Sequence, residues 1–85
     1  MHERLLLLKQ GYQVVLYRNK KYGTTRTDFN NGKSIKLYAE ELGGTDFISL
    51  NYYRLDSGGV CKPCEMPEEK VLDFLRNYQM VEDSL

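Results

Sequence analysis

Apolar and polar residues alternate, with interruptions, over residues 12–55. A period of two places successive side chains on opposite faces of a β-strand, so this run does not form one amphipathic helix. Turn-forming residues divide it into predicted strands at 12–18, 22–29, 33–39 and 46–55. The short segment 60–64 follows a further turn. We therefore expect an antiparallel β-meander of four or five strands.

The segment Asn30–Gly32 gives the strongest local signal in the chain. Asn and Gly tolerate the positive φ values of a tight turn, so the strands on either side should form a hairpin. The first strand, 22–29, alternates threonines with other residues, which predicts a well-solvated strand at an edge of the sheet. The second strand, 33–39, should turn Lys36 and Tyr38 toward the same face.

A helix is expected after the sheet. Pro67 suits its first position, where the missing N–H has no helical partner, and Glu68 and Glu69 suit the positive end of the helix dipole. The apolar residues that follow recur at the spacing of one helix face: Val71, Leu72, Phe74, Leu75 and Tyr78. Their expected partner is the inward face of the sheet, formed by Ile35, Leu37, Ile48 and Leu50. Because a short helix over residues 2–10, ended by Gly11, is also predicted, the fold class is α+β.

The chain has 85 residues, which suits one domain spanning residues 1–85. No stretch approaches the roughly 20 apolar residues of a membrane span, so no membrane association is expected. The apolar block Leu5–Leu8 is too short for a signal peptide, which predicts a cytoplasmic location. Two cysteines in such a chain are expected to be thiols.

Charge is divided unevenly along the chain although the total is zero. Residues 1–39 hold eight basic and two acidic residues, whereas residues 40–85 hold four basic and ten acidic residues. Such a division predicts either two halves that fold against each other or one basic and one acidic face. The zero total argues against strong non-specific affinity for nucleic acid.

A basic and aromatic set lies on three neighbouring predicted strands and their turns. The candidate binding residues are Arg18, Lys20, Lys21, Tyr22, Arg26, Lys36 and Tyr38. Lysines on a solvent-facing sheet also serve solubility and discourage edge aggregation. The function we expect is a non-catalytic binding or accessory domain that uses this sheet face, or an edge strand, to bind a protein partner or an acidic ligand. Single-stranded nucleic acid is an alternative ligand, because lysines contact phosphates and tyrosines stack on bases.

Cys61 and Cys64 are the weak candidates for catalysis. Two cysteines separated by Lys-Pro, shortly before a helix, resemble the arrangement that lowers the pKa of a thiol in redox enzymes. Glu65–Pro67 separate Cys64 from the expected helix, however, and Glu65 adds a neighbouring negative charge. A structural zinc site needs four ligands, and the chain offers only these cysteines and His2. We therefore expect no metal and no cofactor.

Blocks in the C-terminal half carry a family resemblance. Ala39–Leu55 begins with Ala-Glu-Glu-Leu-Gly-Gly, Lys62–Pro67 reads Lys-Pro-Cys-Glu-Met-Pro, and Lys70–Phe74 reads Lys-Val-Leu-Asp-Phe. In these blocks the chain resembles a family of short bacterial, notably cyanobacterial, proteins, of which some are labelled peptide methionine sulfoxide reductase. The resemblance implies a stand-alone domain and, through that label, a cysteine-dependent redox activity.

The resemblance carries over at most one catalytic position. Methionine sulfoxide reductases of the A type use a Gly-Cys-Phe-Trp motif, and this chain has no tryptophan. Those of the B type use paired Cys-x-x-Cys zinc sites and a separate nucleophile, which exceeds the two cysteines present. Cys64 lies within a matching block, so the resemblance places such an activity there, with Cys61 as a resolving thiol.

Overall fold

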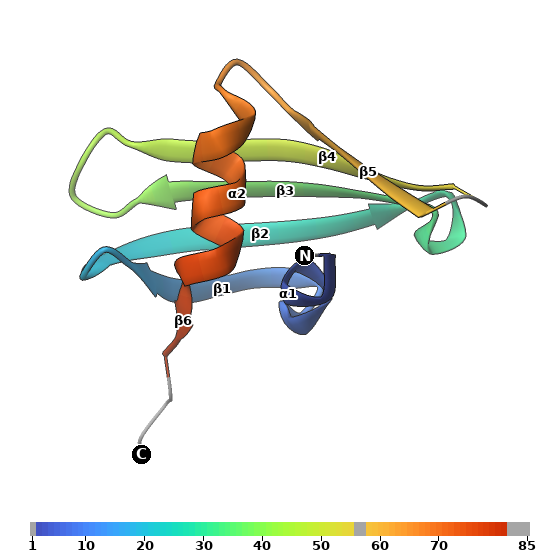
Figure 1. The fold of residues 1–85 in the computed structure, drawn as a ribbon. Coiled ribbons are helices and arrows are strands. Elements are labelled where there is room, and N and C mark those ends of the chain that lie inside the picture. Colours follow the sequence, from blue (N-terminus) through green and yellow to red (C-terminus); the bar gives the residue numbers. More distant parts are fainter. Residues whose placement is uncertain (1, 56–57, 82–85) are drawn as a thin grey trace.

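A computed structural model describes residues 2–55 and 58–81 of the chain, apart from the side chain of His2 (Figure 1). It shows an α+β fold in which six strands form one antiparallel sheet, ordered β5-β4-β3-β2-β1-β6. The elements in chain order are α1 (His2–Leu7), β1 (Gly11–Tyr17), β2 (Lys20–Phe29), the 3₁₀ turn η1 (Asn30–Gly32), β3 (Ser34–Glu41), β4 (Phe47–Leu55), β5 (Gly58–Pro63), α2 (Glu68–Asn77) and β6 (Gln79–Met80). The predicted fold class and β-meander are confirmed, since β1 to β5 are neighbours in sequence order.

The β2–β3 hairpin forms where the sequence predicts it. Asn30, Asn31 and Gly32 have φ values of 55°, 57° and 84°, in the left-handed region that Asn and Gly tolerate best. The strands that η1 connects pair from Phe29 opposite Ser34 to Tyr22 opposite Glu41. This register determines which side chains share a face.

The prediction that β2 lies at an edge is wrong. β2 pairs with β1 on one side and β3 on the other, and Tyr22 and Thr24 are buried. The Thr24 hydroxyl donates to the carbonyl of Tyr22 (3.2 Å), so a threonine can enter the core without leaving a polar group unpaired. The composition of a threonine-rich strand therefore did not reveal its depth in the sheet.

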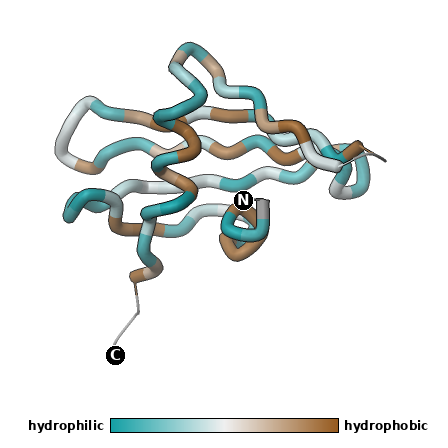
Figure 2. The backbone as a smooth tube through the Cα atoms, viewed as in Figure 1, coloured by the Kyte–Doolittle hydropathy of each residue, from teal (hydrophilic) through white to brown (hydrophobic). Residues whose placement is uncertain are grey.

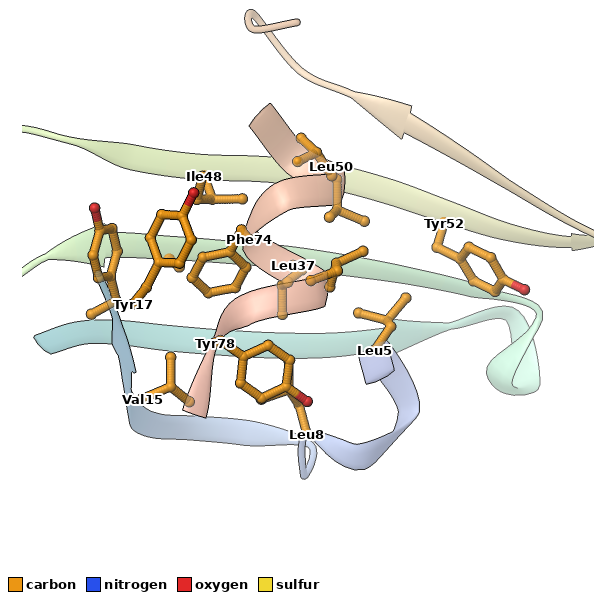
Figure 3. Packing of buried hydrophobic residues seen from close by; sticks show 14 of the residues in the cluster. Leu5, Leu8, Val15, Tyr17, Leu37, Ile48, Leu50, Tyr52, Phe74 and Tyr78 are labelled. Atoms are coloured by element: carbon orange, nitrogen blue, oxygen red, sulfur yellow. The ribbon is translucent and has the colours of Figure 1, made fainter. Parts of the chain in front are cut away.

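The core lies between α2 and one face of the sheet (Figure 3). The predicted inward residues of β3 and β4 are at most 1% exposed, as are Val71 and Phe74 of α2. The Phe74 ring lies 5.0 Å from the Tyr17 ring and 5.8 Å from the Tyr22 ring, both in tilted or edge-to-face geometry. Burying a side chain of this size contributes roughly 1.5–3 kcal/mol. The predicted packing of the helix on the sheet is confirmed.

The two ends of the chain differ from expectation. α1 ends at Leu7, before the predicted stop at Gly11, and Leu5 and Leu8 on either side of this end are at most 1% exposed. Leu7 between them is 60% exposed. After α2 the chain forms the unpredicted strand β6, which pairs with Val15 and Leu16 of β1. Of the segment 80–85 that was expected to fray, residues 82–85 lie outside the described residues, as do Asp56 and Ser57 of an expected turn.

Only one face of the sheet carries helices in the described part of the chain. Both α1 and α2 lie on the side nearest the viewer in Figure 1. Hydrophilic and hydrophobic residues alternate along the strands in Figure 2, as they do when the faces of a sheet have different surroundings. No helix in the described residues is both long enough and apolar enough to cross a membrane.

Candidate functional site

The face of the sheet opposite α2 carries no helix in the described part of the chain. Alternation and register define it, since residues directly opposite each other on paired strands point to the same side. We call it the open face. Its positions are Tyr12, Val14 and Leu16 of β1, Lys21, Gly23, Thr25, Thr27 and Phe29 of β2, Ser34, Lys36, Tyr38 and Glu40 of β3, Phe47, Ser49, Asn51, Tyr53 and Leu55 of β4, and Gly58, Val60 and Lys62 of β5.

A polar row crosses the middle of the open face. Thr27 lies opposite Lys36, Lys36 opposite Asn51, and Asn51 opposite Lys62, so these side chains form one line perpendicular to the strands. We call it the lysine row. Its two lysines lie two strands apart, a separation of roughly 10 Å. Both are exposed.

Tyrosines lie on both sides of the lysine row. Tyr38 follows Lys36 by two residues on β3 and Tyr53 follows Asn51 by two residues on β4. Because β3 and β4 are antiparallel, these two tyrosines lie on opposite sides of the row. Each is 39% exposed, which leaves much of its ring accessible to a ligand.

Tyr12 extends the aromatic surface along β1. A Cβ at Gly23 would lie 2.5 Å from the Tyr12 hydroxyl and 3.2 Å from Leu42 Cδ2, so the missing side chain of Gly23 leaves the space that the Tyr12 ring occupies. Tyr12 is 58% exposed on its other side. Near it, the Tyr38 and Phe47 rings lie 6.1 Å apart. The open face thus presents exposed aromatic rings, and one of them, Tyr12, packs over the backbone of Gly23.

The open face carries more basic than acidic residues, whereas the helix side holds both kinds in ion pairs. Glu40 is the only acidic residue at an open-face position of the described strands, against Lys21, Lys36 and Lys62. No described carboxylate lies within ion-pair distance of these three lysines. Asp46 and Asp73, by contrast, both form ion pairs on the helix side. Two ion pairs, Arg18–Asp73 and Lys20–Glu41, join a base of residues 1–39 to an acid of residues 40–85, so the halves of opposite charge fold against each other.

The structure brings some predicted binding residues together and separates the others. Lys21, Lys36 and Tyr38 lie on the open face. The other four contact carboxylates of this domain, on the helix side of the sheet or in the adjoining turns: Arg18, Lys20, Tyr22 and Arg26. Alternation explains the split, because neighbours such as Lys20 and Lys21 point to opposite faces of β2.

Each of the separated residues has a structural partner. Lys20 pairs with Glu41 (3.3 Å), and Tyr22, which is 3% exposed, donates a hydrogen bond to Asp46 (2.7 Å). Arg26 pairs with Asp28 at 2.9 Å. Tyr22 and Arg26 are therefore largely enclosed, whereas the Lys20 side chain is paired but still 63% exposed.

Sequence reasoning missed four open-face residues: Tyr12, Asn51, Tyr53 and Lys62. A signal for two of them was present, since Ile48 and Leu50 were predicted to point inward, which turns Asn51 and Tyr53 outward. Tyr12 and Lys62 join the face only through strand register, which the sequence alone did not supply.

A second concave site lies on the helix side. Tyr17, Arg18, Asp46, Glu69, Lys70 and Asp73 line a cleft of about 530 Å³ beside α2. Tyr17 and Arg18 both donate to Asp73, and Tyr22 and Lys70 both donate to Asp46. Through these contacts the two aspartates hold α2 and the β3–β4 turn to the sheet. We call these contacts the aspartate latches.

The pKa values in the cleft shift away from neutrality. Burial and the hydrogen bond to Asp46 raise the pKa of Tyr22, and burial and Asp73 raise that of Tyr17. Hydrogen bonds from Tyr17 and Arg18 lower the pKa of Asp73. Burial alone would raise the pKa of Asp46, but hydrogen bonds from Lys70 and Tyr22 together lower it. Such carboxylates are weak bases and such phenols weak acids near neutral pH, so the cleft geometry favours a structural role.

The two thiols point to opposite faces of the sheet. Cys61 lies opposite Tyr52 on the helix side, whereas the Cys64 thiol accepts a hydrogen bond from Asn51 of the open face (3.3 Å). Three residues of extended chain separate their Cα atoms by about 10 Å, beyond the roughly 7 Å limit for a disulfide. Burial, and then the charge of Glu68, raise the pKa of the Cys61 thiol, which disfavours the reactive thiolate. No cluster of three or more His, Cys, Asp or Glu ligands occurs in the described residues.

Comparisons with protein family models, with curated proteins and with solved structures found no match for this chain.

Proposed function

We propose that this domain is a non-catalytic binding module that holds an extended, negatively charged partner on its open face. The observation that carries the proposal is the lysine row, whose lysines have no described carboxylate partner and lie between exposed tyrosines. An anion on this row would meet two positive charges roughly 10 Å apart on one rigid sheet.

The spread of open-face side chains over several strands favours an extended partner. Inner strands use their backbone groups in the sheet ladder, so the open face offers side chains only. Side chains spread over five strands can contact a long ligand at several points, and each exposed lysine contact alone would be weak. Binding should therefore depend on several lysines acting together.

The alternative from the family resemblance is a redox activity like that of a methionine sulfoxide reductase, at Cys64. Cys61 cannot reach Cys64 as a resolving thiol without rearrangement of β5, because the two side chains lie on opposite faces. This geometry supports the binding proposal over the redox alternative. The cytoplasm is the compartment we propose, because two free thiols suit a reducing environment.

The proposal is tested by fluorescence anisotropy with three labelled polyanions: poly-L-glutamate, a heparin fragment and oligo(dT). At least one should bind at low salt, and the double variant Lys36→Ala, Lys62→Ala should bind it at least about tenfold more weakly, since it loses two charge contacts.

The matched control is the double variant Lys20→Ala, Arg76→Ala, which removes the same charge from the helix side of the domain. It should bind the polyanion nearly as well as the unmodified protein. The proposal is wrong if no polyanion binds, or if both double variants weaken binding equally.

A further inference from the structure

We infer that the partner of the open face is single-stranded nucleic acid, with its phosphates along the lysine row and its bases on the flanking tyrosines; this inference rests on the proposed function. Two features that occur together on the open face point to this ligand. These are a line of unpaired cations and aromatic rings on both sides of it.

The lysine row suits a phosphate backbone. Lys36 and Lys62 supply positive charge at two points, and Asn51 between them supplies an amide that donates hydrogen bonds to phosphate or sugar oxygens. The Asn51 amide also contacts the Cys64 thiol (3.3 Å), which fixes its position on the sheet. A backbone laid along this row crosses β3, β4 and β5.

The tyrosines suit unstacked bases. A backbone over the lysine row can place one base on Tyr38 and another on Tyr53, because these rings lie on opposite sides of the row about 7 Å from it. Beside Tyr53, a shallow groove of about 450 Å³ continues toward the sheet edge. Its lining is Tyr53, Leu55, Val60 and Lys62, mainly apolar with one cation at its rim. A planar aromatic base with an attached phosphate matches that chemistry.

Other occupants fit less well. In a duplex the bases are stacked on each other and cannot reach the tyrosines. An acidic peptide would meet the lysines but leave the rings without a stacking partner, and peptides that bind sheets usually pair with an edge strand. In a second copy of this chain, the lysine rows would face each other with only Glu40 to offset them.

The test compares oligo(dT) with an abasic oligonucleotide of the same length, which keeps every phosphate and lacks every base. Oligo(dT) should bind more tightly, and Tyr38→Leu should weaken it by roughly 5- to 150-fold, the range for loss of one stacked base. The same variant should leave abasic binding unchanged, and Tyr38→Phe, which keeps the ring, should bind oligo(dT) like the unmodified protein. Circular dichroism confirms that each variant is folded.

Salt dependence gives an independent measurement. The two lysine contacts predict a slope of log affinity against log salt of about −1.4 for a single strand, and Lys36→Ala should reduce its magnitude by about 0.7. Equal binding of the two oligonucleotides, or binding of poly-L-glutamate alone, overturns the inference and leaves the proposed function standing. Failure of every polyanion overturns both.

Discussion

Arg26 illustrates how the role of a side chain depends on the face of the sheet from which it projects. Arg26 belongs to the basic set that the sequence suggested for binding, but its guanidinium makes a two-point contact with Asp28, at 2.9 Å for each nitrogen. It also donates to the carbonyls of Leu6 in α1 (3.4 Å) and of Leu8 just after it (2.6 Å). Its side chain is only 13% exposed. Arg26 therefore holds the N-terminal segment on the sheet.

Replacing Arg26 by lysine should destabilise the fold. Arg26→Lys keeps the charge but loses the planar fork, so it cannot bind Asp28 and the Leu8 carbonyl together. We expect the free energy of unfolding in urea to fall by about 1–3 kcal/mol. The control Arg18→Lys alters a guanidinium that is 72% exposed and should change stability much less than Arg26→Lys does. Equal losses in the two variants would contradict this role for Arg26.

At the scale of elements, α2 is held by more than apolar packing. The aspartate latches join Asp73 of α2 to Tyr17 and Arg18, and Lys70 of α2 to Asp46 before β4. Each carboxylate accepts from a tyrosine and a cation, so its contacts depend on its negative charge. The position of α2 over the sheet is therefore sensitive to acid.

The latches predict a pH dependence of stability. The pKa values of Asp46 and Asp73 are lowered in the folded state, so the folded protein binds fewer protons than the unfolded chain in acid. Their contribution is full well above the ordinary value of 3.8 and is lost as the pH falls below it through the folded values. Urea unfolding midpoints measured from neutral pH into acid should show this decline.

Variants distinguish the contribution of Asp46 and Asp73 to the acid decline in stability from that of other carboxylates. The double variant Asp46→Asn, Asp73→Asn should lower stability at neutral pH and flatten the acid decline. Glu40→Gln, which changes a carboxylate of the open face, should leave the decline as it is. An unaltered decline in the double variant would show that other groups cause it.

The helices and strands were largely predictable from the sequence, but the position of each strand within the sheet was not. The period of two, the Asn30–Gly32 turn and the α2 stripe predicted the meander and its covering helix because each is a local pattern. The position of β2 inside the sheet depends on pairing with β1 and β3 and on the burial of Tyr22 and Thr24, which the composition of the strand does not reveal. The strand β6 has two residues, too few to carry a period.

For the whole molecule, the sequence predicted either two halves of opposite charge that fold against each other or two faces of opposite charge, and it did not give the members of a face. Lys36 and Tyr38 could be placed together because they alternate on one strand. Tyr12 and Lys62 join them through pairing across β1 to β5, which no local pattern reports. Strand register thus converts a scattered set of lysines and tyrosines into one candidate surface.

The seven tyrosines report directly on which face binds. Tyr12, Tyr38 and Tyr53 lie on the open face, whereas the other four lie on the helix side: Tyr17, Tyr22, Tyr52 and Tyr78. The decisive measurement is NMR of the tyrosine ring resonances during titration with a short oligo(dT). Binding on the open face predicts shifts in the resonances of the three open-face rings, with those of Tyr17 and Tyr22 unchanged. Shifts confined to Tyr17 and Tyr22 would place binding in the cleft beside α2 and contradict it.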